Sequence, residues 1–108
     1  MLDWVAVSNS LAAPSAGLDH PLADRARAIL QGTAAPPPIA GLIGFRPVAL
    51  TAGHAVFELD TDLDRHANPM GTLHGGILCD LADAAMGFAY ASTIDAAESF
   101  TTLELQIF

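Results

Sequence analysis

The chain has 108 residues, 52% of them hydrophobic, which suffices for one domain with a modest core. Twelve acidic residues stand against four arginines and no lysine, and the resulting net charge of -8 opposes binding to the phosphates of nucleic acids. No apolar run approaches the roughly 18 residues of a membrane span, so neither nucleic acid nor a membrane is an expected partner.

Two further features bear on the compartment. Asp3 precedes the first apolar stretch, so the basic region that opens a secretory signal peptide is missing. The only cysteine, Cys79, excludes an internal disulfide framework, and we expect it to be an inert thiol on a buried helix. Both features favour a cytoplasmic location.

The first 35 residues are expected to form a leader and a covering helix. Residues 1–18 lack periodicity and contain Pro14 and Gly17, which is typical of a mobile leader with at most one short turn of helix. From Asp19, a capping residue, the pattern predicts a helix that has Pro21 in its first turn and ends at Gly32. This helix is expected to close one end of the core, with His20 at the surface.

Residues 36–61 are expected to begin the domain proper. Three successive prolines, 36–38, predict an extended linker. Residues 42–50 read as a strand, which Pro47 restricts to a sheet edge or a bulge. A turn at 51–53 leads into a second strand, 54–61, in which Phe57 and Leu59 face away from Val56 and Glu58. Together these segments predict a hairpin.

The stretch from His66 to Gly87 carries the residues with chemical potential. A polar, turn-rich loop delivers two glycines, Gly75 and Gly76, to the start of a helix over about 75–91. Amides at that helix start are unpaired and sit at the positive end of the helix dipole, so they can stabilise a developing oxyanion. The helix is apolar almost all round, which predicts that other structure surrounds it and that Asp80 and Asp83 are buried.

Helix geometry separates the two ends of this stretch. Gly75 and Asp83 are eight positions apart, or roughly 12 Å along one helix. They cannot both contact one small reacting group. If both serve the same reaction, the carboxylate comes from a second copy whose helix runs antiparallel, as in a two-fold dimer.

The last segment, 101–108, alternates as a half-buried strand does, with Leu103, Leu105 and Ile107 on one side. A helix of about 17 residues, roughly 25 Å long, needs more sheet than three short strands to cover it. We therefore expect this sequence to be the N-terminal part of a larger domain.

The motif residues resemble those of a known family. The pattern His66-x-Asn68-Pro69-x-Gly71-x-x-His74-Gly75-Gly76, followed by Leu81-x-Asp83 and Gly87, is similar to the signature of the PaaI-like acyl-CoA thioesterases of the hot-dog fold. The resemblance implies an α+β fold in which an antiparallel sheet wraps a long central helix, within a domain that spans 36–108 here. It also implies a homodimer or a dimer of dimers, with acyl-CoA bound between subunits.

The resemblance implies a role for each motif residue. The Gly75 amide would polarise the thioester carbonyl, and Asn68 and His74 would shape the pocket. Asp83 of the partner subunit would be the general base or the nucleophile. Thr102, with Thr101 close behind, matches the position of a hydroxyl that holds the attacking water or the carboxylate. The remaining substrate contacts are assigned to Gly76, His66 and Thr101, whereas Asp80 is expected to make a structural hydrogen bond.

Other readings remain open. No cofactor is expected, and the absence of CxxC, HExxH and helical ligand spacing argues against a metal site. The coenzyme A phosphates would have to use the four arginines, Arg25, Arg27, Arg46 and Arg65, or residues outside this chain. The alternatives to a thioesterase are an inert truncated hot-dog fragment, a fragment that only dimerises or aggregates, and a hot-dog dehydratase or hydratase. The acyl group is not defined by the sequence.

Overall fold

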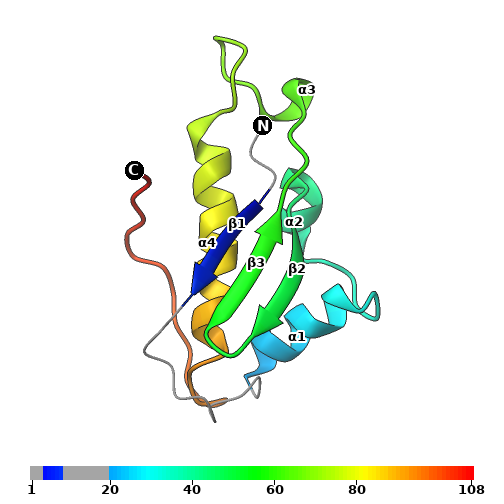
Figure 1. Ribbon diagram of the computed structural model, residues 1–108, viewed down its shortest axis with the longest axis vertical. Helices are drawn as coiled ribbons and strands as arrows, with labels where there is room; N and C mark the ends of the chain where they lie inside the picture. The colour runs from blue at the N-terminus through cyan, green and yellow to red at the C-terminus, as the bar shows by residue number, and fades with distance from the viewer. Residues whose placement is uncertain (1–3, 9–19) are drawn as a thin grey trace.

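The computed structural model describes residues 20–108 and the backbone of residues 4–8 (Figure 1). Seven elements follow one another along the chain: β1 (Trp4–Ser8), α1 (Pro21–Leu30), α2 (Pro38–Ile43), β2 (Arg46–Thr51), β3 (His54–Glu58), α3 (Leu63–His66) and α4 (Gly75–Ala91). The fold is α+β, as expected. Among the described residues, no helix combines the length and the apolar character needed to cross a membrane.

An antiparallel sheet of three strands, in the order β1-β3-β2, packs against α4 (Figure 1). The core lies between β3 and α4, because the alternation of β3 directs Ala55, Phe57 and Leu59 toward the helix. On the helix side, Leu81, Ala85 and Ala89 recur at the spacing that places side chains on one face. The predicted division of β3 into an inner and an outer face is confirmed.

The hairpin is also confirmed, with one correction. The register of β2 shifts between Pro47 and Ala49, so the predicted bulge is present, and β2 forms an edge of the sheet. However, β2 begins at Arg46 rather than residue 42, because α2 takes up the preceding residues. Pro38 stands in the first turn of α2, where its fixed φ suits a helix, and Gly44 ends it with a φ of 101°.

The expectation for the N-terminal leader is wrong over residues 4–8. This segment pairs antiparallel with β3, Trp4 opposite Glu58 and Ser8 opposite His54. Trp and Val have high strand propensity, and the free edge of β3 supplies the hydrogen-bond partners that a single strand lacks. The remainder of the expected leader, residues 9–19, lies outside the described residues.

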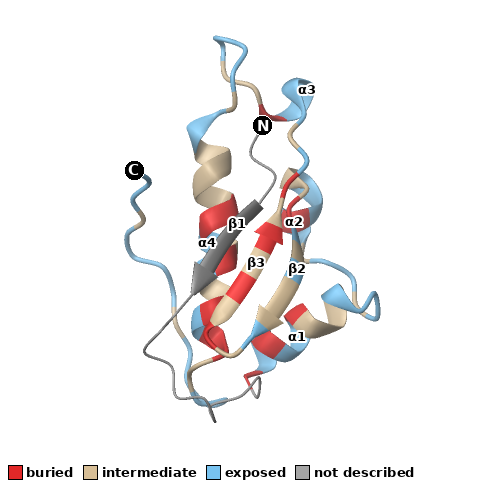
Figure 2. Cartoon of the chain, viewed as in Figure 1, coloured by how far each residue is buried: buried red, intermediate tan, exposed pale blue. Residues whose placement is uncertain are grey.

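The predicted strand at 101–108 is likewise wrong. This segment has no strand partner among the described residues, and it runs back along α4 apart from the sheet (Figure 1). Most of it is exposed (Figure 2), and the side chain of Leu103 is 94% exposed. Alternation of apolar residues predicts which face a strand would bury, but a strand forms only where a neighbouring backbone completes its hydrogen bonds.

Helix α1 begins one residue later than predicted, and its cap differs. His20, not Asp19, is the N-cap, and its Nδ1 accepts a hydrogen bond of 3.1 Å from the Leu22 amide. Its Nε2 lies 2.9 Å from the carbonyl oxygen of Glu98, so the ring ties α1 to the connection after α4. His20 is therefore buried, contrary to the expectation of a surface position.

Candidate functional site

The loop before α4 is held by His66. Its Nδ1 accepts a 3.0 Å hydrogen bond from the Asp62 amide, so the ring proton lies on Nε2, which donates to the carbonyl of Ile43 at 2.6 Å. The side chain is 3% exposed. Because both ring nitrogens are engaged, His66 has no free atom for a ligand and fixes the loop instead. The expected substrate contact of His66 stays a prediction.

Asn68 organises the tip of the same loop. Its Oδ1 accepts hydrogen bonds from the amides of Met70 and Thr72 at 3.0 and 3.1 Å, and its Nδ2 donates to the Thr72 hydroxyl at 2.8 Å. Gly71 completes the turn with a φ of 77°. Asn68 thus fixes the loop before α4 through bonds to Met70 and Thr72, and its expected role in shaping a substrate pocket stays a prediction.

His74 caps α4 by bonding the amide of Gly76, so the amides of Gly75 and Gly76 differ in their hydrogen bonding. Its Nδ1 accepts a 2.9 Å hydrogen bond from the Gly76 amide, and its own amide donates to the carbonyl of His66 at 2.8 Å. The Gly76 amide is therefore occupied by the His74 ring, and its expected contact with substrate stays a prediction. A Cβ at Gly76 would lie 2.9 Å from His74 Nδ1, so a side chain there would disturb the cap.

The Gly75 amide remains available. Within residues 20–108 it has no hydrogen-bond partner, and Gly75 is exposed with nothing within 4 Å of an added Cβ. It stands at the first position of a 17-residue helix, where the helix dipole favours negative charge. An exposed amide at a helix start can donate a hydrogen bond to a negatively charged ligand.

Asp83 lies in the middle of α4 on the face turned away from the sheet, and it is exposed rather than buried as predicted. The Thr102 hydroxyl donates a 2.5 Å hydrogen bond to its Oδ1. The structure thus brings together the carboxylate and the hydroxyl named from the sequence. Asp80, one turn earlier, is half-buried and makes no hydrogen bond among the described residues, so its expected structural bond stays a prediction.

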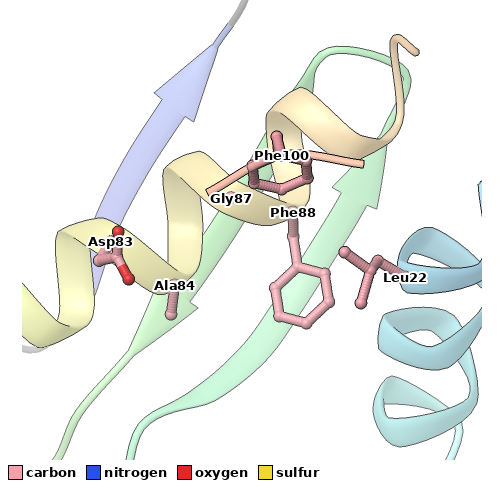
Figure 3. Close-up of a pocket in the computed structure, with 6 residues that line it drawn as sticks. All are labelled: Leu22, Asp83, Ala84, Gly87, Phe88 and Phe100. Carbon is pink, nitrogen blue, oxygen red and sulfur yellow. The ribbon is translucent and has the colours of Figure 1, made fainter. Parts of the chain in front are cut away.

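Three hollows meet at Asp83. One, of about 180 Å³, is lined by Leu22, Asp83, Ala84, Gly87, Phe88 and Phe100 (Figure 3). A second, of about 170 Å³, lies toward α2 and includes Asp80 and Phe45. The third, of about 380 Å³, includes Thr101, Thr102 and Glu104. Thr101 thus lines a hollow beside Asp83, and its expected contact with substrate stays a prediction.

Sequence reasoning missed three apolar lining residues, Leu22, Phe88 and Phe100. Leu22 lies in the expected covering helix, for which the sequence indicates no ligand contact, and Phe100 directly precedes the expected strand at 101–108. Phe88 belonged to a helix that is apolar on every side, so its direction could not be read from periodicity. Their convergence depends on contacts between distant segments, which no local pattern signals.

The arginines are mostly engaged in local contacts. Arg46 pairs with Glu58 and with Asp60, and these acceptors outweigh the effect of burial and raise its pKa. The Arg65 guanidinium donates to the carbonyl of Leu42 at 2.8 Å. Arg27 pairs with Asp24 at 3.1 Å. Within the described part of the chain, no three potential metal-ligating side chains come together.

No protein-family model, no curated protein and no solved structure matches this chain.

Proposed function

We propose that the chain acts as an acyl-CoA thioesterase of the PaaI-like hot-dog type, with coenzyme A and a free acid as products. The observation that carries the proposal is the Asp83 carboxylate held by the Thr102 hydroxyl at 2.5 Å, on the exposed face of a helix whose first amide, at Gly75, has no hydrogen-bond partner among the described residues. A general base and an oxyanion donor are the two groups that thioester hydrolysis needs.

The hot-dog architecture is part of this proposal. A long helix, α4, packs on an antiparallel sheet, and the approach loop leads into the two glycines that begin α4, in the order that the family signature has. Within this chain the sheet covers one face of α4 and leaves Asp83, Met86 and Tyr90 exposed on the other. Such a half-covered helix fits a fold that is completed by further strands or by a second copy.

The active site is proposed to lie between two copies. Gly75 and Asp83 are on one unbroken helix, so the same copy separates them by roughly 12 Å. Two antiparallel α4 helices around a two-fold axis would bring the Gly75 of one copy to the Asp83 of the other, twice. A dimer, alone or paired as a dimer of dimers, is therefore the proposed assembly.

The reaction follows from these groups. A water oxygen attacks the thioester carbon while Asp83 accepts its proton, and the carbonyl oxygen takes the negative charge beside the Gly75 amide. Collapse of this intermediate breaks the C–S bond, and the proton on Asp83 neutralises the departing thiolate. In the alternative route Asp83 attacks the carbon directly and forms an anhydride that water then cleaves. The Thr102 hydroxyl orients the carboxylate in either route.

Thiol release tests the proposal. Purified protein is incubated with acetyl, butyryl, hexanoyl and benzoyl esters of coenzyme A, and free thiol is measured. Wild type is expected to release thiol, and Asp83→Asn to lose at least about a hundredfold in rate. Asp64→Asn is the matched control, because that exposed carboxylate makes no hydrogen bond among the described residues. Unsaturated or hydrated acyl-CoA without free thiol would instead indicate the dehydratase or hydratase.

A specific observation favours a second candidate, a non-catalytic dimerisation module. The apolar side chains of Leu103, Ile107 and Phe108 are exposed on a segment without a strand partner among the described residues. Exposed backbone donors and acceptors next to apolar side chains can pair with another chain. Self-association without thiol release from any ester, and without binding of acyl-CoA, would support this candidate over the enzyme.

A further inference from the structure

We propose that Gly87 and Leu22 set the size of the acyl group, and that the hollow of about 180 Å³ beside Asp83 accepts compact acyl groups of about six carbon atoms rather than long chains. The identification of the ligand as an acyl group rests on the proposed thioesterase function. The hollow and its size follow from the packing of three segments, which are α1, α4 and the segment after α4.

The walls are apolar and fixed. Phe88 stacks on Phe57 of β3 with ring centroids 5.3 Å apart, and Phe100 meets the Tyr90 ring edge-to-face at 5.1 Å. Rings anchored in this way hold their positions without a ligand, so little ordering is needed on binding. Asp83 is the only charged group among the six lining residues, and it marks the end at which the reacting carbonyl would lie.

Leu22 limits the length of the hollow. In Figure 3 it points toward Phe88, and Leu22 and Asp83 lie at opposite ends of the labelled side chains. Its position is fixed at the backbone, because its amide donates to His20 Nδ1 while His20 Nε2 is bonded to the carbonyl of Glu98. The start of α1 is thus tied to the segment that supplies Phe100.

Gly87 limits the width. A Cβ added there would lie 3.8 and 3.9 Å from two atoms of the Phe100 ring, which is ordinary van der Waals contact. Gly87→Ala therefore occupies space in the hollow without a clash, and alanine also favours the helix. This substitution separates an effect on ligand size from an effect on folding, which few pocket residues allow.

The volume sets the scale. An apolar cavity of about 150 Å³ holds one benzene molecule, and a liquid water occupies about 30 Å³, so the hollow has room for about six non-hydrogen atoms. One methylene group in an apolar pocket changes discrimination by about tenfold to two-hundredfold. A single added methyl at Gly87 should therefore be measurable.

The test uses ketone analogues of acyl-CoA, in which a methylene separates the sulfur from the carbonyl so that no thioester can be cleaved. Acyl lengths of two, four, six, eight and ten carbons are titrated calorimetrically into wild type, Gly87→Ala, Leu22→Ala and the control Gly41→Ala. Gly41 is an exposed helical glycine with nothing within 4 Å of an added Cβ. Thiol release from the matching thioesters is measured in parallel.

Wild type and Gly41→Ala are expected to bind the six-carbon analogue tightest. Gly87→Ala should weaken that analogue by about tenfold and shift the optimum to four carbons, whereas Leu22→Ala should shift it to eight. Equal affinities for analogues of all acyl lengths would overturn the inference, and so would an unchanged preferred length in both Gly87→Ala and Leu22→Ala. If thiol is still released in either case, the proposed thioesterase function stands. The expected binding pattern without thiol release would support acyl binding in the hollow and contradict the proposed thioesterase activity. Absence of binding by every analogue would overturn the inference.

Discussion

The Thr102 hydroxyl and the Asp83 carboxylate, 19 residues apart in the chain, are joined by a hydrogen bond of 2.5 Å. The bond fixes one carboxylate oxygen, and in the proposed reaction the other oxygen would take the proton of water or attack the thioester. It also attaches the segment after α4 to the middle of the helix, at the point where three hollows meet. The proposed chemistry depends on this pair.

Removal of the Thr102 hydroxyl should therefore lower activity without unfolding the protein. Thr102→Val keeps the shape of the side chain but cannot donate, and we expect kcat to fall about tenfold, since hydrogen bonds to charged groups contribute about 1.5–3 kcal/mol and this one is exposed. Thr102→Ser restores the donor and should recover most of the rate. Equal rates for the valine and serine variants would show that the hydroxyl has no part in the reaction.

The two glycines that open α4 should respond differently to alanine. At Gly76 the new Cβ would lie 2.9 Å from His74 Nδ1 and displace the cap, whereas at Gly75 it would meet nothing within 4 Å. Loss of a helix N-cap costs about 1 kcal/mol. Gly76→Ala is expected to lower the free energy of unfolding in urea by about that amount relative to Gly75→Ala. Similar urea midpoints for the two variants would contradict the capping role of His74.

His66 should matter for stability more than for substrate binding. His66→Leu leaves the Asp62 amide and the Ile43 carbonyl without their partner, and each unsatisfied buried group costs about 1–3 kcal/mol. We expect a loss of about 2 kcal/mol or more in urea unfolding, with KM little changed in the fraction that remains folded. A His66→Leu variant with native stability and a strongly raised KM would indicate that His66 contacts the substrate.

The sequence predicted the elements whose signals are local. The bounds of α4 follow from two glycines before a long apolar pattern, and the hairpin follows from alternation on both sides of a Gly-containing turn. It failed where a partner lies far along the chain. Strand β1 exists because it pairs with residues about fifty positions later, and the segment 101–108, with a better strand pattern, has no such partner among the described residues.

The candidate site divides in the same way. Asp83 and Thr102 were placed together through a family resemblance, and the structure brings them into contact. The burial of His20 and His66 could not be predicted, because their acceptors, the carbonyls of Glu98 and Ile43, are backbone groups that leave no trace in the sequence pattern. The walls of the hollow beside Gly87, formed by Leu22, Phe88 and Phe100, also come together only in the folded chain and could not be predicted.

Gly75→Pro offers a way to remove the proposed oxyanion donor alone. Proline is favoured at the first helical position, and His74 before it has φ -66° and ψ 131°, which a following proline tolerates. The amide makes no hydrogen bond within the described residues, so stability should change little. We expect kcat to fall about a hundredfold to a thousandfold, as for other oxyanion donors. An active, folded Gly75→Pro protein would remove Gly75 from the mechanism.

The most direct measurement of the shared site mixes two inactive proteins. Gly75→Pro retains Asp83, and Asp83→Asn retains the Gly75 amide, so a mixed dimer would contain one intact site and one site that lacks both groups. After unfolding and joint refolding at equal concentrations, thiol release should return to about one quarter of the wild-type rate, because half of the dimers are mixed and half of their sites are intact. Recovery to that level, with neither variant active alone, is the predicted result. A mixture that associates yet stays as inactive as its components would contradict a catalytic site built from two copies of this chain.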